Sequence, residues 1–105
     1  MNYYLEMQKR ADYIGWKWED TGGHVPVFFK KMYGYTLVLS MDNAVMYKGG
    51  ITIEDILEGF GDEQIVYIID PTNFDEMYKV GFTHAEAFEL YNIYLVAFGD
   101  LIEWK

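Results

Sequence analysis

The feature that most constrains the fold of this chain is a change of hydrophobic pattern at Gly49-Gly50. Between residues 16 and 47, short segments rich in β-branched and aromatic residues alternate with turn residues, as in antiparallel strands joined by tight connections. After the glycine pair, apolar residues recur mainly at three- and four-residue intervals, which predicts amphipathic helices. Strands and helices are therefore partly segregated along the chain, and this order favours an α+β fold.

Helical periodicity predicts four helices. Thr52 with Asp55, and Thr83 with Glu86, have the spacing of a capping box, in which two side chains satisfy free N–H groups of the first turn. Glycines follow the predicted helices, where their access to the left-handed backbone region favours termination. We expect helices over residues 2–14, 53–58, 73–80 and 83–98. The first is stopped by Gly15, the second by Gly59 with Gly61, and the third by Gly81, while Gly99 ends or kinks the fourth.

Five strands are predicted, over residues 16–19, 25–32, 35–39, 44–47 and 65–69. Pro26 cannot donate to a β-ladder, so it indicates either an edge position or the start of its strand. The run at residues 65–69 is almost continuously apolar, which is typical of a buried central strand. The length of 105 residues fits one domain, residues 1–105. We expect a small antiparallel sheet of about four to five strands, with an N-terminal helix and C-terminal helices packed on it.

Charge is distributed unevenly along the chain, whose formal net charge is −9. Residues 1–50 hold six basic and five acidic residues, a sum of +1, whereas residues 51–105 hold two basic and twelve acidic residues, a sum of −10. Such asymmetry indicates an interaction surface. The candidate partner-binding residues are the acids on predicted helices or their flanks: Glu54, Asp55, Glu58, Asp62, Glu63, Asp75, Glu76, Glu86 and Glu89.

An acidic helical face steers a protein toward a basic surface. The sequence therefore predicts a non-enzymatic binding protein whose partner is a nuclease, a polymerase or a DNA-binding protein. Carboxylates in a row can also imitate duplex DNA, which carries one negative charge per about 1.7 Å of axis. In size, acidity, aromatic content and lack of cysteine, the whole chain is similar to phage-encoded inhibitors of host defence, including anti-CRISPR proteins. No shared motif carries this similarity, so no residue takes a role from it.

Three alternatives stay open. The negative charge can serve only to keep the protein dispersed in solution. Aromatic residues make up 19% of the chain, so a small-ligand-binding or regulatory module with an aromatic pocket is a second alternative. The third is an oligomeric structural or assembly protein.

Several kinds of chemistry lack the residues they need. The chain has no cysteine, which excludes disulfides, zinc–thiolate sites and thiol catalysis. Its one serine, Ser40, and its two histidines, His24 and His84, lie in no nucleophile-elbow or triad pattern, and the His-Glu-x-x-His and EF-hand spacings are missing. Asp70-Pro71 has the pattern of a turn. We therefore expect no enzyme activity, no catalytic residue, no metal site and no cofactor.

The sequence also bears on where the protein acts. Direct nucleic-acid binding requires a basic stripe, and Lys30-Lys31 is the only basic cluster beside aromatic residues. The longest apolar stretch, residues 85–98, is interrupted by Glu86 and Glu89, and the first ten residues lack the apolar stretch of a signal peptide. We expect a cytoplasmic protein that binds neither nucleic acid nor membrane directly, and whose oligomeric state the sequence leaves open.

Overall fold

The structure, a computed structural model, describes residues 3–20, 26–32, 34–59 and 61–102. Its elements are, in chain order, α1 Tyr3–Ile14, β1 Lys17–Asp20, β2 Pro26–Met32, β3 Tyr35–Leu39, β4 Ala44–Lys48, α2 Ile53–Leu57, the 3-10 helix η1 Asp62–Gln64, β5 Ile65–Ile69, α3 Phe74–Lys79 and α4 His84–Ile102. The five strands form one antiparallel sheet in which the spatial order repeats the sequence order, β1-β2-β3-β4-β5. The predicted α+β fold is confirmed.

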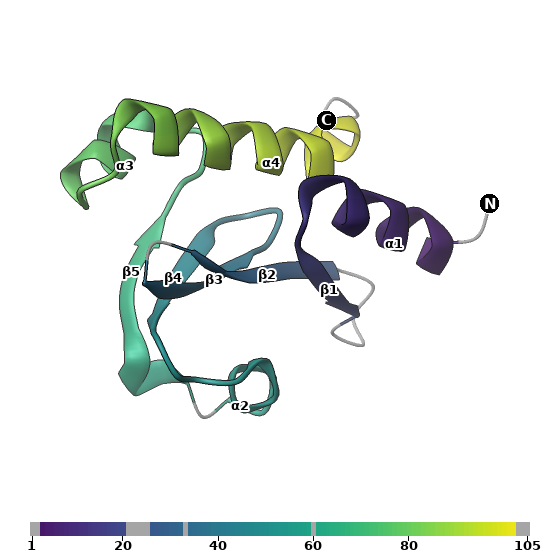
Figure 1. Ribbon diagram of the computed structural model, residues 1–105, viewed down its shortest axis with the longest axis horizontal. Coiled ribbons are helices and arrows are strands. Elements are labelled where there is room, and N and C mark those ends of the chain that lie inside the picture. The colour runs from purple at the N-terminus through teal and green to yellow at the C-terminus, as the bar shows by residue number, and fades with distance from the viewer. Residues whose placement is uncertain (1–2, 21–25, 33, 60, 103–105) are drawn as a thin grey trace.

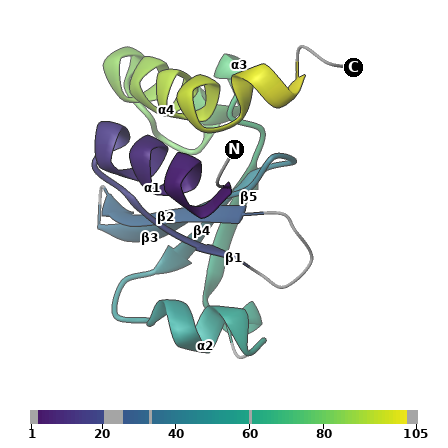
Figure 2. The same cartoon turned by 90° about the vertical axis from the view of Figure 1, so that its right-hand side faces the viewer.

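The helices occupy two sides of the sheet. Helices α1, α3 and α4 gather on one side, and the short helix α2 lies on the other, so the sheet stands between them (Figures 1 and 2). On the first side, the Arg10 guanidinium of α1 donates from Nη1 to the backbone carbonyl of Ala97 in α4, at 2.6 Å. This bond ties the N-terminal helix to the C-terminal one.

Tight turns set the register of the central strands. Between β2 and β3, Gly34 has a φ of +80°, a conformation that favours glycine because it has no Cβ. Between β3 and β4, the N–H of Ser40 donates to the carbonyl of Asn43 at 2.9 Å, and Ser40 Oγ accepts the N–H groups of Asp42 and Asn43. These bonds close the tight turn between the predicted strands at residues 35–39 and 44–47. Of the two positions that Pro26 indicated, the start of the strand is the one found.

The main core lies between the sheet and helices α1, α3 and α4. Phe28, Leu39, Ala44 and Ile69 are direct cross-strand partners, so their side chains share one face of the sheet, and all four are buried. They belong to one cluster with buried helical side chains, among them Met7, Ala11, Met77, Leu90 and Phe98. The rings of Phe28 and Phe98 meet edge to face with centroids 5.5 Å apart, which joins β2 to α4 directly.

The predicted helix starts are also found. Thr83 Oγ1 accepts the N–H of Glu86 at 3.2 Å, while Glu86 Oε1 accepts the N–H of Thr83 at 2.8 Å, which completes the capping box of α4. Thr52 Oγ1 likewise accepts the N–H of Asp55 at 3.2 Å. These bonds satisfy donors that have no partner within a first helical turn, so the local sequence fixes where α2 and α4 begin.

The prediction of a buried central strand at residues 65–69 is wrong. β5 is an edge strand, and the side chains of Tyr67 and Ile68 are 40% and 56% exposed. The reason is topological: in a sheet whose strands follow chain order, the last strand pairs on one side only. An apolar run shows that side chains favour burial, and does not show how many neighbouring strands will cover them.

Two further expectations need correction. The helical spacing of Ile53, Ile56 and Leu57, together with Phe60, favours an inner face for the second helix, yet α2 has no buried residue because it lies away from the main core. Of the two outcomes expected at Gly99, an end or a kink, the end is wrong, because α4 continues to Ile102. A glycine inside a helix costs only about 1 kcal/mol relative to alanine, and the fully buried Phe98 beside it holds this turn in place. The predicted turn at residues 21–23, His24 and Phe60 lie outside the described residues.

Candidate functional site

The nine predicted partner-binding acids do not share one face. Five of them lie on α2, on its C-cap or on η1: Glu54, Asp55, Glu58, Asp62 and Glu63. The other four lie on α3 and α4: Asp75, Glu76, Glu86 and Glu89. Because α2 and the α3–α4 pair lie on opposite sides of the sheet, the structure brings the first five together and separates them from the other four (Figures 1 and 2).

The five acids of residues 54–63, which we call the acidic α2 surface, are all exposed. They come from ten consecutive residues, and the chain from residue 49 to residue 78 contains neither lysine nor arginine. Their mutual repulsion is therefore not relieved by basic residues of the same segment. Such a concentration of one sign produces an outward field that attracts a basic surface.

Two of the four acids of α3 and α4 are partly covered by the protein's own structure. Glu86 is half-buried, and its carboxylate is bonded to the N–H of Thr83 in the helix cap. Glu76 is half-buried as well, in the first turn of α3. At least Glu86 thus stabilises a helix start, so this group offers a partner less available charge than the acidic α2 surface does.

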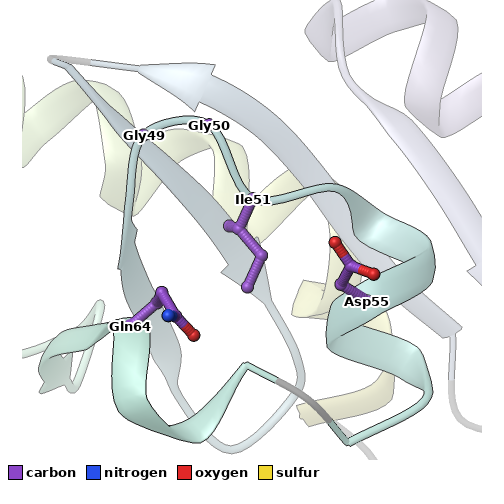
Figure 3. A pocket seen from close by; sticks show the side chains of 5 residues that line it. All are labelled: Gly49, Gly50, Ile51, Asp55 and Gln64. Carbon is purple, nitrogen blue, oxygen red and sulfur yellow. The ribbon is translucent and has the colours of Figure 1, made fainter.

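A hollow opens beside the acidic α2 surface. It has a volume of about 550 Å³ and is lined by Gly49, Gly50, Ile51, Asp55 and Gln64. Figure 3 shows the side chains of Ile51, Asp55 and Gln64 projecting toward the space between the β4–α2 connection and η1. The hollow therefore offers a partner one carboxylate, one amide and one apolar side chain next to the exposed acids.

Gly61 and Tyr47 hold this segment against the sheet. A Cβ placed on the buried Gly61 would lie 3.0 Å from Tyr47 Cε1 and 3.1 Å from Ile51 Cδ1, so these two side chains would have to move by a few tenths of an ångström to admit a larger residue. The Tyr47 side chain is buried, and its pKa is raised, chiefly because burial disfavours the phenolate and also because Asp62 adds negative charge nearby. Sequence reasoning treated Gly61 only as a helix stop and assigned no role to Tyr47.

The raised pKa of Tyr47 predicts a loss of stability in alkali. Below about pH 10 the tyrosine is protonated in both the folded and the unfolded chain, so its contribution is fully present; above that pH the unfolded chain loses the proton first, and stability falls. In Tyr47→Phe this loss is removed, so the free energy of unfolding should fall less steeply between about pH 9 and pH 11. Urea unfolding across this range, followed by circular dichroism, measures both slopes; equal slopes would contradict the prediction.

Asp70 and His84, two residues with catalytic potential, both make local contacts. The Asp70 carboxylate accepts the N–H of Thr72 at 2.9 Å and its hydroxyl at 2.6 Å, so it shapes the predicted turn after β5. His84 is the first residue of α4, and its Nδ1 lies 2.6 Å from the hydroxyl of Tyr78, on which its ring stacks. Among the residues that the structure describes, no three histidine, aspartate or glutamate side chains are grouped to hold a metal ion.

A second hollow lies between α1 and α4 and is mainly apolar. Its volume is about 470 Å³, and its lining includes Tyr13, Ile14, Phe88, Ile93 and Val96. The Tyr13 side chain is 80% exposed at its rim. With two aromatic residues in its lining, this hollow is one candidate for the aromatic pocket of a small ligand.

Searches among protein-family models, curated proteins and solved structures found no match to this chain. In the described parts of the chain, no helix has both the length and the apolar character needed to cross a membrane.

Proposed function

We propose that this chain is a non-enzymatic binding protein that uses its acidic α2 surface to occupy a basic region of a nucleic-acid-handling protein. The observation that supports the proposal most is the grouping of five exposed carboxylates within residues 54–63, on a segment without basic residues. The partner class is a nuclease, a polymerase or a DNA-binding protein, since each of these carries a basic groove for phosphates. By occupying that groove, the protein would inhibit its partner, as phage-encoded anti-CRISPR and related anti-defence proteins do.

Physical chemistry favours charge as the source of recognition. Complementary charge raises the association rate, by about a hundredfold or more at low salt compared with a neutral pair. At about 0.15 M ionic strength the Debye length is about 8 Å, so the attraction between exposed charges weakens as salt is added. Complex formation by this protein should therefore become slower and weaker as ionic strength rises.

The test is an affinity capture from a bacterial lysate at low salt, with the tagged protein as bait and elution by a rising salt gradient. Nucleic-acid-binding proteins are expected in the salt eluate, and mass spectrometry identifies them. For each purified candidate, a duplex oligonucleotide should compete with the protein for binding, because both would fill the same groove. Partners that stay bound at high salt, or that bind the oligonucleotide and the protein together, would contradict the proposal.

The second candidate function, a small-ligand module, depends on the hollow between α1 and α4. A thermal-shift screen against nucleotides and metabolites tests it, because a ligand that binds only the native state raises the melting temperature. A hit that Phe88→Ala abolishes would place a ligand in that hollow and favour the second function.

A further inference from the structure

The free edge of β5 differs from the edges that proteins normally leave exposed. Natural edge strands are protected by charges, prolines, bulges or short length, because unpaired backbone groups invite another strand. The sequence of β5, Ile-Val-Tyr-Ile-Ile, holds no charge, proline or glycine. The register of the β4–β5 pair shifts near Val66, which has no partner residue in β4. Tyr67, Ile68 and Ile69 pair regularly with β4. The irregularity at Val66 protects only the N-terminal part of β5, and the three residues from Tyr67 to Ile69 form a short but regular apolar edge.

The opposite edge of the same sheet provides the comparison. β1 has only four residues, and three of them, Lys17, Glu19 and Asp20, are charged. It is also tied to α1, since Trp18 Nε1 donates to Gln8 Oε1 at 3.2 Å and the hydroxyl of Tyr4 to Asp20 at 3.2 Å. One edge of the sheet is therefore protected by charge and by a helix, whereas β5 has neither charge within it nor such a helix among the elements described.

Charge at the two ends of β5 indicates what can pair with it. Asp62 and Glu63 lie in η1, with one residue between them and the strand, and Asp70 follows the strand directly. A second copy of the chain, added antiparallel, would place Asp62 and Glu63 of one molecule opposite Asp70 of the other, and like charges facing each other destabilise a pair. A strand with lysine or arginine at its ends would be attracted at both ends.

We propose that β5 binds an extended segment of the partner by strand addition, and that this segment is apolar at alternate positions and basic at both ends. Backbone hydrogen bonds would supply affinity, while the exposed side chains of Tyr67 and Ile68 would contact the added strand on the two faces of the sheet. The inference rests on the proposed function, because η1 connects the acidic α2 surface directly to β5. A single basic partner can therefore contact both.

A synthetic peptide tests the proposal without knowledge of the natural partner. The probe has two lysines at each end of five alternating valine and threonine residues, and it is titrated into the full-length ¹⁵N-labelled protein at low salt. Hydrogen exchange of amides within Ile65–Ile69 should slow by at least about tenfold in the bound state. The same peptide with N-methyl groups at alternate residues, or with glutamates in place of the lysines, should bind at least about tenfold more weakly.

Substitutions in the protein complete the test. Ile68→Lys places a positive charge on the edge and should weaken binding of the lysine-ended peptide at least about tenfold; Leu95→Lys, which adds the same charge at an exposed apolar position of α4, should not. Thermal unfolding of both variants checks that they fold.

Each other outcome counts against strand addition. Binding that perturbs only residues 54–63 would overturn it and leave the proposed function standing. Absence of peptide binding would also overturn it. Exchange protection that rises with protein concentration alone would assign the edge to a second copy of the chain. Equal binding of the glutamate-ended peptide would refute the role of charge.

Discussion

Replacing Leu90 by alanine should remove about 2–5 kcal/mol from the free energy of unfolding. Leu90 lies on α4, is 0% exposed, and belongs to the cluster that joins the sheet to α1, α3 and α4. Its truncation removes buried apolar surface and leaves a cavity that close-packed neighbours cannot fill. Because a domain of this size is stable by only about 5–15 kcal/mol, the variant should lose a large share of its stability.

Leu95→Ala is the matched control, since it makes the same chemical change on the same helix at a position that is 41% exposed. Its cost to the free energy of unfolding should stay below about 1 kcal/mol, because surface substitutions usually change that free energy by no more than about 0.5 kcal/mol. Urea unfolding of both variants, followed by circular dichroism, gives the two free energies. Equal losses would mean that α4 does not bury the face that contains Leu90.

The joint change Glu54→Lys, Asp55→Lys and Glu58→Lys should abolish capture of the basic partner. Each substitution adds two charges, so the formal net charge rises from −9 to −3, and the acidic α2 surface changes from five negative charges to three positive and two negative. Attraction toward a basic groove then becomes repulsion, and association should slow by about a hundredfold or more at low salt. Surface plasmon resonance against a partner identified by affinity capture measures this rate.

The matched control is Asp75→Lys, Glu76→Lys and Glu89→Lys, which changes the net charge by the same amount on the other side of the sheet. Both triple variants replace two acids in the first turn of a helix, where each acid contributes about 0.3–1 kcal/mol through the helix dipole. Their costs to stability should therefore be similar and leave the fold intact. If only the control variant lost binding, the binding site would lie on α3 and α4. If both triple variants bound the partner unchanged, the acidic residues would serve only solubility.

The two proposals together describe one continuous region at the end of the sheet. The acidic α2 surface would attract a basic partner over a distance, and the β5 edge would then hold an extended segment in register. Their experiments separate them, because salt and charge reversal act on the first contact, while N-methylation of the peptide and Ile68→Lys act on the second. A partner that requires both should show the combined losses of the two sets of variants.

Local chemistry made much of the fold predictable from the sequence. Thr52, Asn73 and Thr83 begin helices because their side chains accept N–H groups only three residues away. Gly34 and the Ser40–Asn43 turn fix their hairpins over equally short distances. The α+β class and most element boundaries follow from such contacts, since they depend on neighbours in sequence.

The side of the sheet on which each helix lies was decided by tertiary structure alone. The sequence determined that acids 54–63 and 75–89 would lie on helices or their flanks, and it could not determine that the sheet would stand between the two groups. In the same way, the apolar pattern of Ile65–Ile69 determined a strand, while its edge position came from the order in which five strands paired. A hydrophobic pattern records only that a side chain favours burial. Which surface buries it, and which charges remain together outside, depends on packing between segments that are distant in the chain.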